Sequence, residues 1–132
     1  MKKVTYGSWV ASFVTRMADY LNLPGWIITI EHVPAAKGSC AADICIDSTY
    51  MQAHLTTYQM CEEDFKKGDI DHLVLILTHE LCHILVDPFH DHAEPFLSDT
   101  TRPFFQNMLE NQTQKLTAVL LKNLPKSIIP PR

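Results

Sequence analysis

The chain has 132 residues, which is enough for one ordinary domain but too few for two domains with separate cores. Hydrophobic residues make up 46% of it and charged residues 20%, as is typical of a soluble globular protein. The formal charge of -4 leaves no basic excess for binding phosphate backbones, so nucleic acid is not expected as a partner. We therefore expect one domain over residues 1–132.

The four cysteines form no C-x-x-C pair, which favours free thiols in a reducing compartment. The N-terminal segment is interrupted by polar residues and lacks a small-residue cleavage site, so it is not expected to be a secretion signal. No run approaches the ~18 apolar residues of a membrane span. We expect a cytoplasmic protein with no membrane partner.

The first half of the chain predicts one helix and three strands. Apolar residues recur at helical spacing from Val10 to Leu21, which predicts an amphipathic helix with its N-cap at Ser8. Residues 26–30, 42–47 and 53–58 are rich in β-branched or aromatic side chains or alternate with polar ones, which predicts strands. The polar link Ser48-Thr49 suits a tight turn between the second and third strands.

The second half is mostly helical in pattern. Residues 62–67 predict a short helical turn before Gly68. From Asp69 to just before Asp87-Pro88 the chain is apolar on nearly every face, which predicts a helix buried at the centre of the domain. Residues 89–102 predict an irregular loop, and a last helix runs from Pro103 to about Leu124. The expected fold class is α+β, with a small three-stranded sheet, possibly mixed.

The sequence His79-Glu80-Leu81-Cys82-His83 lies on that central helix. Residues four apart share one helical face, so His79 and His83 can offer imidazole nitrogens to one ion. Glu80 lies beside the metal, where its carboxylate can take a proton from a water molecule. The simpler interpretation is a pair of core histidines with a surface glutamate. We favour the metal site, because burying these groups without a shared partner would be costly.

A catalytic zinc ion usually has three protein ligands and one open position. Glu110 on the last helix is one candidate for the third ligand, with Thr113 on the same side as support. It lies off the main apolar stripe of that helix, so the alternative is that it is only solvated. His90 and His92, in the expected loop, are the other candidates. We predict Glu110, because a long packed helix holds a ligand in place at no further ordering cost.

The segment Leu77-Thr78-His79-Glu80-Leu81-Cys82-His83-Ile84, followed by a helix with Glu110-Asn111-Gln112-Thr113, resembles the zincins. More narrowly it is similar to the short, minigluzincin-like branch of the gluzincin metallopeptidases. The resemblance implies one Zn²⁺ per chain, held by His79, His83 and Glu110, with Glu80 as general base. It also implies that an edge strand pairs with an extended peptide substrate. The residues at the matching positions are Leu55, Thr56, Thr57 and Tyr58.

Some positions depart from related patterns. Val86 and Phe89 occupy the offsets where a metzincin has its glycine and third histidine, which excludes that branch. Asn111 and Gln112 replace the small residues that usually follow the ligand glutamate. The residue that stabilises the oxyanion is open among Tyr58, His90 and His92.

Three functional hypotheses follow from these patterns. The leading one is a zinc-dependent metallopeptidase, in which Glu80 activates the attacking water and then protonates the leaving amine. The alternative is a non-catalytic structural or regulatory zinc module whose open position is filled by a side chain. Hydrolysis of another amide, or processing of nucleic acid, is the third, and the acidic balance of the chain disfavours the latter.

Overall fold

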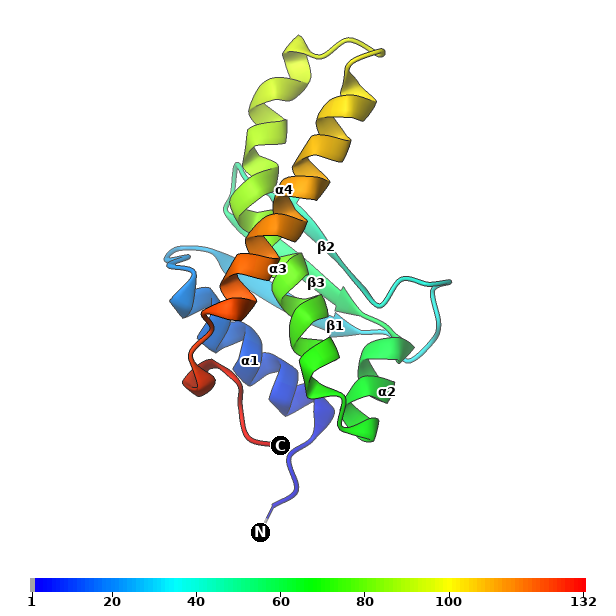
Figure 1. The fold of residues 1–132 in the computed structure, drawn as a ribbon, viewed down its shortest axis with the longest axis vertical. Coiled ribbons are helices and arrows are strands. Elements are labelled where there is room, and N and C mark those ends of the chain that lie inside the picture. Colours follow the sequence, from blue (N-terminus) through cyan, green and yellow to red (C-terminus); the bar gives the residue numbers. More distant parts are fainter. Residues whose placement is uncertain (1) are drawn as a thin grey trace.

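The computed structural model describes residues 2–132, which form an α+β fold of four α-helices and a three-stranded mixed sheet (Figure 1). In chain order the elements are α1 (Tyr6–Tyr20), β1 (Ile27–His32), β2 (Ala42–Asp47), β3 (Gln52–Thr57), α2 (Gln59–Lys67), α3 (Ile70–Ala93), the 3₁₀ turn η1 (Glu94–Phe96), α4 (Arg102–Lys122) and the 3₁₀ turn η2 (Lys126–Ile128). The predicted α+β class and the sheet of three strands are confirmed.

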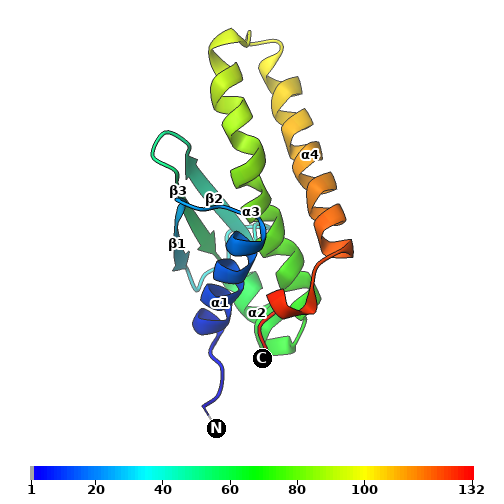
Figure 2. The ribbon, with the colours of Figure 1, turned by 90° about the vertical axis from the view of Figure 1, so that its left-hand side faces the viewer.

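Helix α1 begins three residues earlier than the sequence predicted. Thr5, not Ser8, is the N-cap, and its Oγ1 accepts a hydrogen bond from the backbone amide of Ser8 at 3.2 Å. The predicted apolar face is buried, with Trp9, Phe13 and Met17 fully inaccessible. This face forms the core together with α3 and the inner side of the sheet, and the outer side of the sheet is not covered by any described helix (Figure 2).

The strand order in the sheet is β1-β3-β2. β3 runs parallel to β1 and antiparallel to β2, so its backbone is paired along both sides. Its inward side chains Ala53, Leu55 and Thr57 are almost completely buried. β2 is therefore an edge strand, and β3 is the central one. The β2–β3 hairpin is confirmed, but its link spans residues 48–51 and includes Met51 in the left-handed region at φ 53°.

Helix α2 is longer than the predicted turn and ends, as expected, at Gly68. This glycine has φ 82°, a left-handed conformation in which a side chain is strained. A Cβ atom here would also lie only 2.6 Å from a guanidinium nitrogen of Arg132. The next helix, α3, then starts at the predicted place, where the Asp69 carboxylate caps the amide of His72.

Helix α3 continues through Pro88 to Ala93, so the predicted loop over residues 89–102 is wrong in its first third. Proline inside a helix removes one hydrogen bond and typically costs about 3 kcal/mol. Contacts with other elements offset this cost. The His90 ring stacks on Phe105 of α4 at a centroid distance of 6.0 Å, and Glu94 pairs with Arg102 at 2.7 Å. As a result α3 and α4 form an antiparallel hairpin that projects beyond the sheet (Figures 1 and 2).

The most deeply buried residues of helix α4 are small and polar and do not belong to its main apolar stripe. Thr113 and Thr117 are 0% and 2% exposed, whereas Met108 is 49% exposed. Each threonine hydroxyl donates to the carbonyl four residues earlier, so burying it leaves no unpaired group. Glu110 lies one turn before Thr113 on this same face. Glu110 lies away from the apolar stripe because it shares the face of α4 that carries the buried Thr113 and Thr117. It is therefore not simply a solvated residue.

Within residues 2–132, the segment Ile70–Phe96 is long and apolar enough to span a membrane by length and composition, with a mean hydropathy of 1.3. The count of consecutive apolar residues did not indicate this, because polar residues such as Asp71 and Thr78 interrupt the run. A helix in the core of a folded domain meets the same criterion. Here the segment packs against β2, α2 and α4.

Candidate metal centre

His79 and His83 lie one turn apart on the face of α3 that packs against α4. Their rings meet edge to face, with centroids 4.9 Å apart, and their side chains are 21% and 16% exposed. Both Nε2 atoms face α4. The local geometry expected from the spacing of the two histidines is therefore present.

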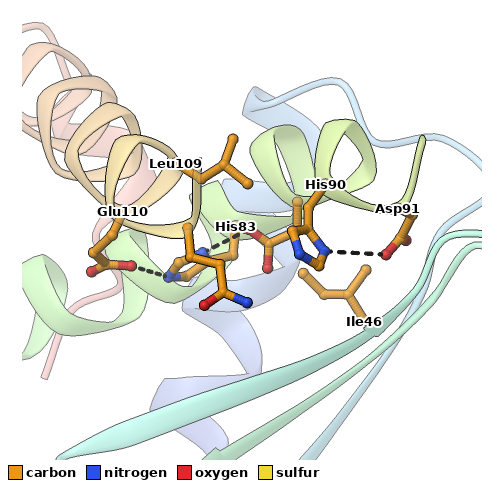
Figure 3. Close-up of a pocket in the computed structure, with 8 residues that line it drawn as sticks. Ile46, His83, His90, Asp91, Leu109 and Glu110 are labelled. Atoms are coloured by element: carbon orange, nitrogen blue, oxygen red, sulfur yellow. Dashed lines mark hydrogen bonds and ion pairs between the residues drawn. The ribbon is translucent and has the colours of Figure 1, made fainter. Parts of the chain in front are cut away.

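Glu110 of α4 reaches both histidines. Its Oε1 lies 3.0 Å from His79 Nε2, and its Oε2 lies 3.4 Å from His83 Nε2. Figure 3 shows the Glu110 carboxylate pointing at the His83 ring across the space between the two helices. One ligand atom from each of the three residues falls within 4.8 Å of the others. The structure thus brings the three predicted ligands together.

The distances fit a shared ion. Two ligand atoms about 2.0–2.2 Å from a tetrahedral zinc ion are roughly 3.4 Å apart, close to the two contacts of Glu110. A second group, formed by Asp64, Asp69 and His72, also lies within 4.8 Å. Its Asp64 Oδ2 and His72 Nδ1 are only 2.6 Å apart, however, and Asp69 caps α3. That spacing fits a proton between the two atoms better than a metal ion, so we interpret this group as a structural ion pair between α2 and α3.

Asp87 fixes the orientation of His83. The Nδ1–H of His83 donates to Asp87 Oδ1 at 3.0 Å, since an ionised carboxylate can only accept. This leaves the lone pair on Nε2, the atom that faces Glu110. Metal-binding histidines commonly have such a carboxylate partner. Thr113, which was expected in the supporting role, donates a hydrogen bond from its hydroxyl instead to the carbonyl of Leu109 on its own helix.

The two histidines have opposite pKa shifts. Burial lowers the pKa of His79 below its ordinary value, although the neighbouring Glu110 opposes this effect. Burial also acts to lower the pKa of His83, but the hydrogen bond that its ring donates to Asp87 and the surrounding carboxylates outweigh this effect and raise the pKa. The lowered pKa of His79 favours the neutral imidazole, the form that binds metals.

Glu80 is half-buried beside the two histidines and is not a member of the cluster of possible ligands. Burial raises the pKa of its carboxyl to about 7, with a smaller opposing effect from His83 and further increases from Glu110, Asp43 and Asp87. A carboxyl with a pKa near neutrality can both accept and donate a proton at that pH. This is the property that a general base followed by a general acid requires.

His90 and His92 lie on α3 and not in a loop. His92 is exposed, and neither residue belongs to the cluster of possible ligands. His90 Nε2 lies 2.9 Å from Glu94 Oε2, yet neither atom makes a hydrogen bond, and both are shielded from solvent. The structure therefore joins Glu110 to the two motif histidines and leaves His90 about two turns further along the helix.

A cavity of about 250 Å³ opens beside His83 and Glu110. It lies between the projecting half of α3, the facing part of α4 and the end of β2 (Figure 3). The residues that line it are Ile46, His83, Asp87, His90, Asp91, Gln106, Leu109 and Glu110. Ile46 was not among the predicted site residues, because nothing in the strand pattern of 42–47 indicates that this strand borders the helix with the motif.

The predicted substrate-binding strand needs correction. Residues 55–58 were expected on an edge strand, but Leu55, Thr56 and Thr57 belong to the central strand β3, whose backbone is already paired with β1 and β2. Leu55 and Thr57 are fully buried, and Tyr58 is 8% exposed with its hydroxyl bonded to Asp43. These residues therefore have no free edge to offer a peptide.

Comparison with known proteins gives no relative: no protein family, curated protein or solved structure matches the chain. The geometry described above is thus the basis for a functional proposal.

Proposed function

We propose that the chain is a zinc-dependent metallopeptidase of the gluzincin type, with His79, His83 and Glu110 as the metal ligands and Glu80 as the general base. The observation that carries the proposal is the meeting of these three side chains, from two helices, at distances suited to one ion. Glu80, next to His79 in the chain, remains outside that group.

The donor set supports zinc. Two imidazole nitrogens and one carboxylate are the ligands of several catalytic zinc sites, which keep one further position open. The cavity beside His83 and Glu110 gives a substrate access to such a position. A structural zinc site would instead be closed by a fourth side chain. None of the other histidines, cysteines or carboxylates in residues 2–132 joins the three within the spacing of a shared ion.

A bound zinc ion would supply Lewis acidity, lowering the pKa of a water ligand to about 7 and polarising the scissile carbonyl. Glu80 then accepts the proton of the attacking water and delivers it to the leaving nitrogen. Its raised pKa suits both steps, since proton transfer is most efficient when the pKa is close to the working pH. Asp87 holds the His83 ring in the ligating orientation.

β2 replaces β3 as the strand proposed to pair with substrate. Within the described residues its outer edge has no strand partner, and its residue Ile46 lines the cavity beside His83. A peptide laid along this edge would gain main-chain hydrogen bonds, while the side chains at alternate positions enter neighbouring pockets.

The test is cleavage by matched variants. Zinc-loaded wild-type protein is incubated with an unfolded protein substrate, and new N-termini are mapped by mass spectrometry. Glu80→Gln is expected to keep its zinc and to lose cleavage by about 10²- to 10⁴-fold, the usual contribution of a general base. Glu63→Gln, on the exposed side of α2, serves as the control and is expected to cleave normally.

Zinc binding without cleavage by the wild-type protein would support the non-catalytic zinc module instead. Loss of zinc from Glu80→Gln would show that Glu80 is a ligand and that the proposed mechanism is wrong.

A further inference from the structure

The cavity next to the metal centre has the size of one side chain. Its volume of about 250 Å³ lies below the roughly 300–1,000 Å³ of pockets that hold a whole small molecule. Because His83 and Glu110 form part of its wall, a substrate whose scissile bond lies at the metal would place a neighbouring side chain in this space. The inference below rests on the proposed peptidase function and concerns which side chain fits.

The wall of the cavity carries three carboxylates and, among the described residues, no lysine or arginine. The carboxylates belong to Asp87, Asp91 and Glu110. The nearby Arg102 is held away by Glu94 at 2.7 Å and Asp99 at 2.8 Å. If Glu110 binds a metal ion, Asp87 and Asp91 still remain as negative groups.

The two aspartates are fixed in place but retain free acceptor capacity. Asp87 Oδ1 is bonded to His83, and Asp91 Oδ2 accepts from the hydroxyl of Ser48 in the β2–β3 link. No hydrogen bond engages the second oxygen of Asp87 within residues 2–132, and that of Asp91 has only the His90 ring at 3.9 Å.

The cavity also has an apolar part. Ile46 of β2 and Leu109 of α4 lie on opposite sides of it (Figure 3). Long cationic side chains bury their methylene stems on such surfaces and keep the charged end among polar groups. A purely apolar side chain would remove the aspartates from water without compensation, and an acidic one would be repelled.

We infer that this cavity is the specificity subsite of the peptidase and that it accepts a lysine or arginine side chain, held by Asp91 and Asp87 and packed on Ile46 and Leu109. The substrate class is therefore peptides with a basic residue next to the cleaved bond.

The experiment measures binding and not turnover. Acetyl-lysine hydroxamate and acetyl-norleucine hydroxamate share a metal-binding group and the same aliphatic stem, and differ only in the ε-amino group. Isothermal titration of each into the zinc-loaded protein is expected to show about tenfold tighter binding of the lysine compound. Asp91→Asn should weaken this preference, since only Asp87 then remains to pair with the amine. Asp99→Asn, which removes a fully exposed carboxylate outside the cavity, should keep it.

Equal binding of the two hydroxamates by the wild-type protein would overturn the basic subsite and leave the proposed metal site standing. A preference as strong in Asp91→Asn as in the wild type would also overturn it. If neither compound binds the zinc-loaded protein, the metal centre itself is wrong, and the subsite is rejected with it.

Discussion

The Nδ1 atom of His83 lies 3.0 Å from Oδ1 of Asp87, one turn further along α3. Because this bond determines which ring nitrogen keeps its lone pair, it links a residue outside the ligand set to metal binding.

Asp87→Ala is expected to weaken zinc binding by about 10- to 100-fold, the range typical of carboxylates that orient a ligating histidine. Competition with a chromophoric chelator measures the affinity. Asp91→Ala is the control, since Asp91 lies one turn further along and bonds to Ser48 instead. Equal zinc affinity of the two variants would show that Asp87 does not orient the ligand.

Glu110→Gln is expected to reduce zinc affinity by at least about 100-fold, since it removes the only anionic ligand of the proposed site. Glu94→Gln is the matched control, because Glu94 has a similar exposed fraction, 40% against 46%, in the same helical hairpin. If His90→Ala loses zinc and Glu110→Gln does not, the third ligand is His90.

Glu80→Gln is expected to stabilise the metal-free protein. The pKa of this carboxyl rises from 4.5 to about 7 on folding, so its ionised form disfavours the folded state. This cost is absent below pH 4.5, grows between pH 4.5 and 7, and is complete above pH 7. Urea unfolding with a chelator at pH 8 should therefore show a gain of about 1–3 kcal/mol, shrinking to under about 1 kcal/mol at pH 5. Glu63→Gln should show no such pH-dependent gain.

The folded protein is expected to lose stability above pH 9. Burial raises the pKa of the Cys61 thiol from 9.0 to about 12, and burial raises the pKa of Tyr6 well above its usual range. A group whose pKa is raised on folding contributes stability in full below its unfolded pKa and loses it as the pH rises further. Each such group can cost up to about 1.4 kcal/mol per pH unit.

Thermal unfolding under reducing conditions between pH 8 and pH 11 measures this effect. Cys61→Ala should depend less on pH than the wild type, whereas Cys45→Ala, which removes an exposed thiol, should not differ from it. An unchanged dependence in Cys61→Ala would contradict the assignment of this effect to the buried thiol.

The part of the site that local spacing determines could be predicted from the sequence. His79 and His83 are four residues apart on a helix, so any regular helix places them together. The position of Glu110 depends in addition on which face of α4 meets α3, which local spacing does not determine. The apolar stripe indicated another face, and the buried Thr113 and Thr117 show why: small side chains whose hydroxyls bond to their own helix allow close packing of the two helices.

Two features depend on contacts between distant segments and were predicted incorrectly. Pro88 indicated a helix end, but packing of His90 and Glu94 on α4 keeps α3 helical beyond it. Residues 53–58 were expected at an edge because the resemblance to the gluzincins implies an edge strand just before the helix with the motif. Their central position results from the parallel pairing of β3 with β1. The complete burial of Leu55 and Thr57 agrees with this central position.

The location of a bound zinc ion tests the central claim most directly. Crystals of the zinc-loaded protein, measured at the zinc absorption edge, give an anomalous difference map that reports the position of each ion. We predict one peak per chain, between His79, His83 and Glu110, with a carboxylate oxygen of Glu110 about 2.0–2.2 Å from the ion. A peak at Asp64, Asp69 and His72, or one held by His90 while Glu110 lies out of reach, would contradict the account.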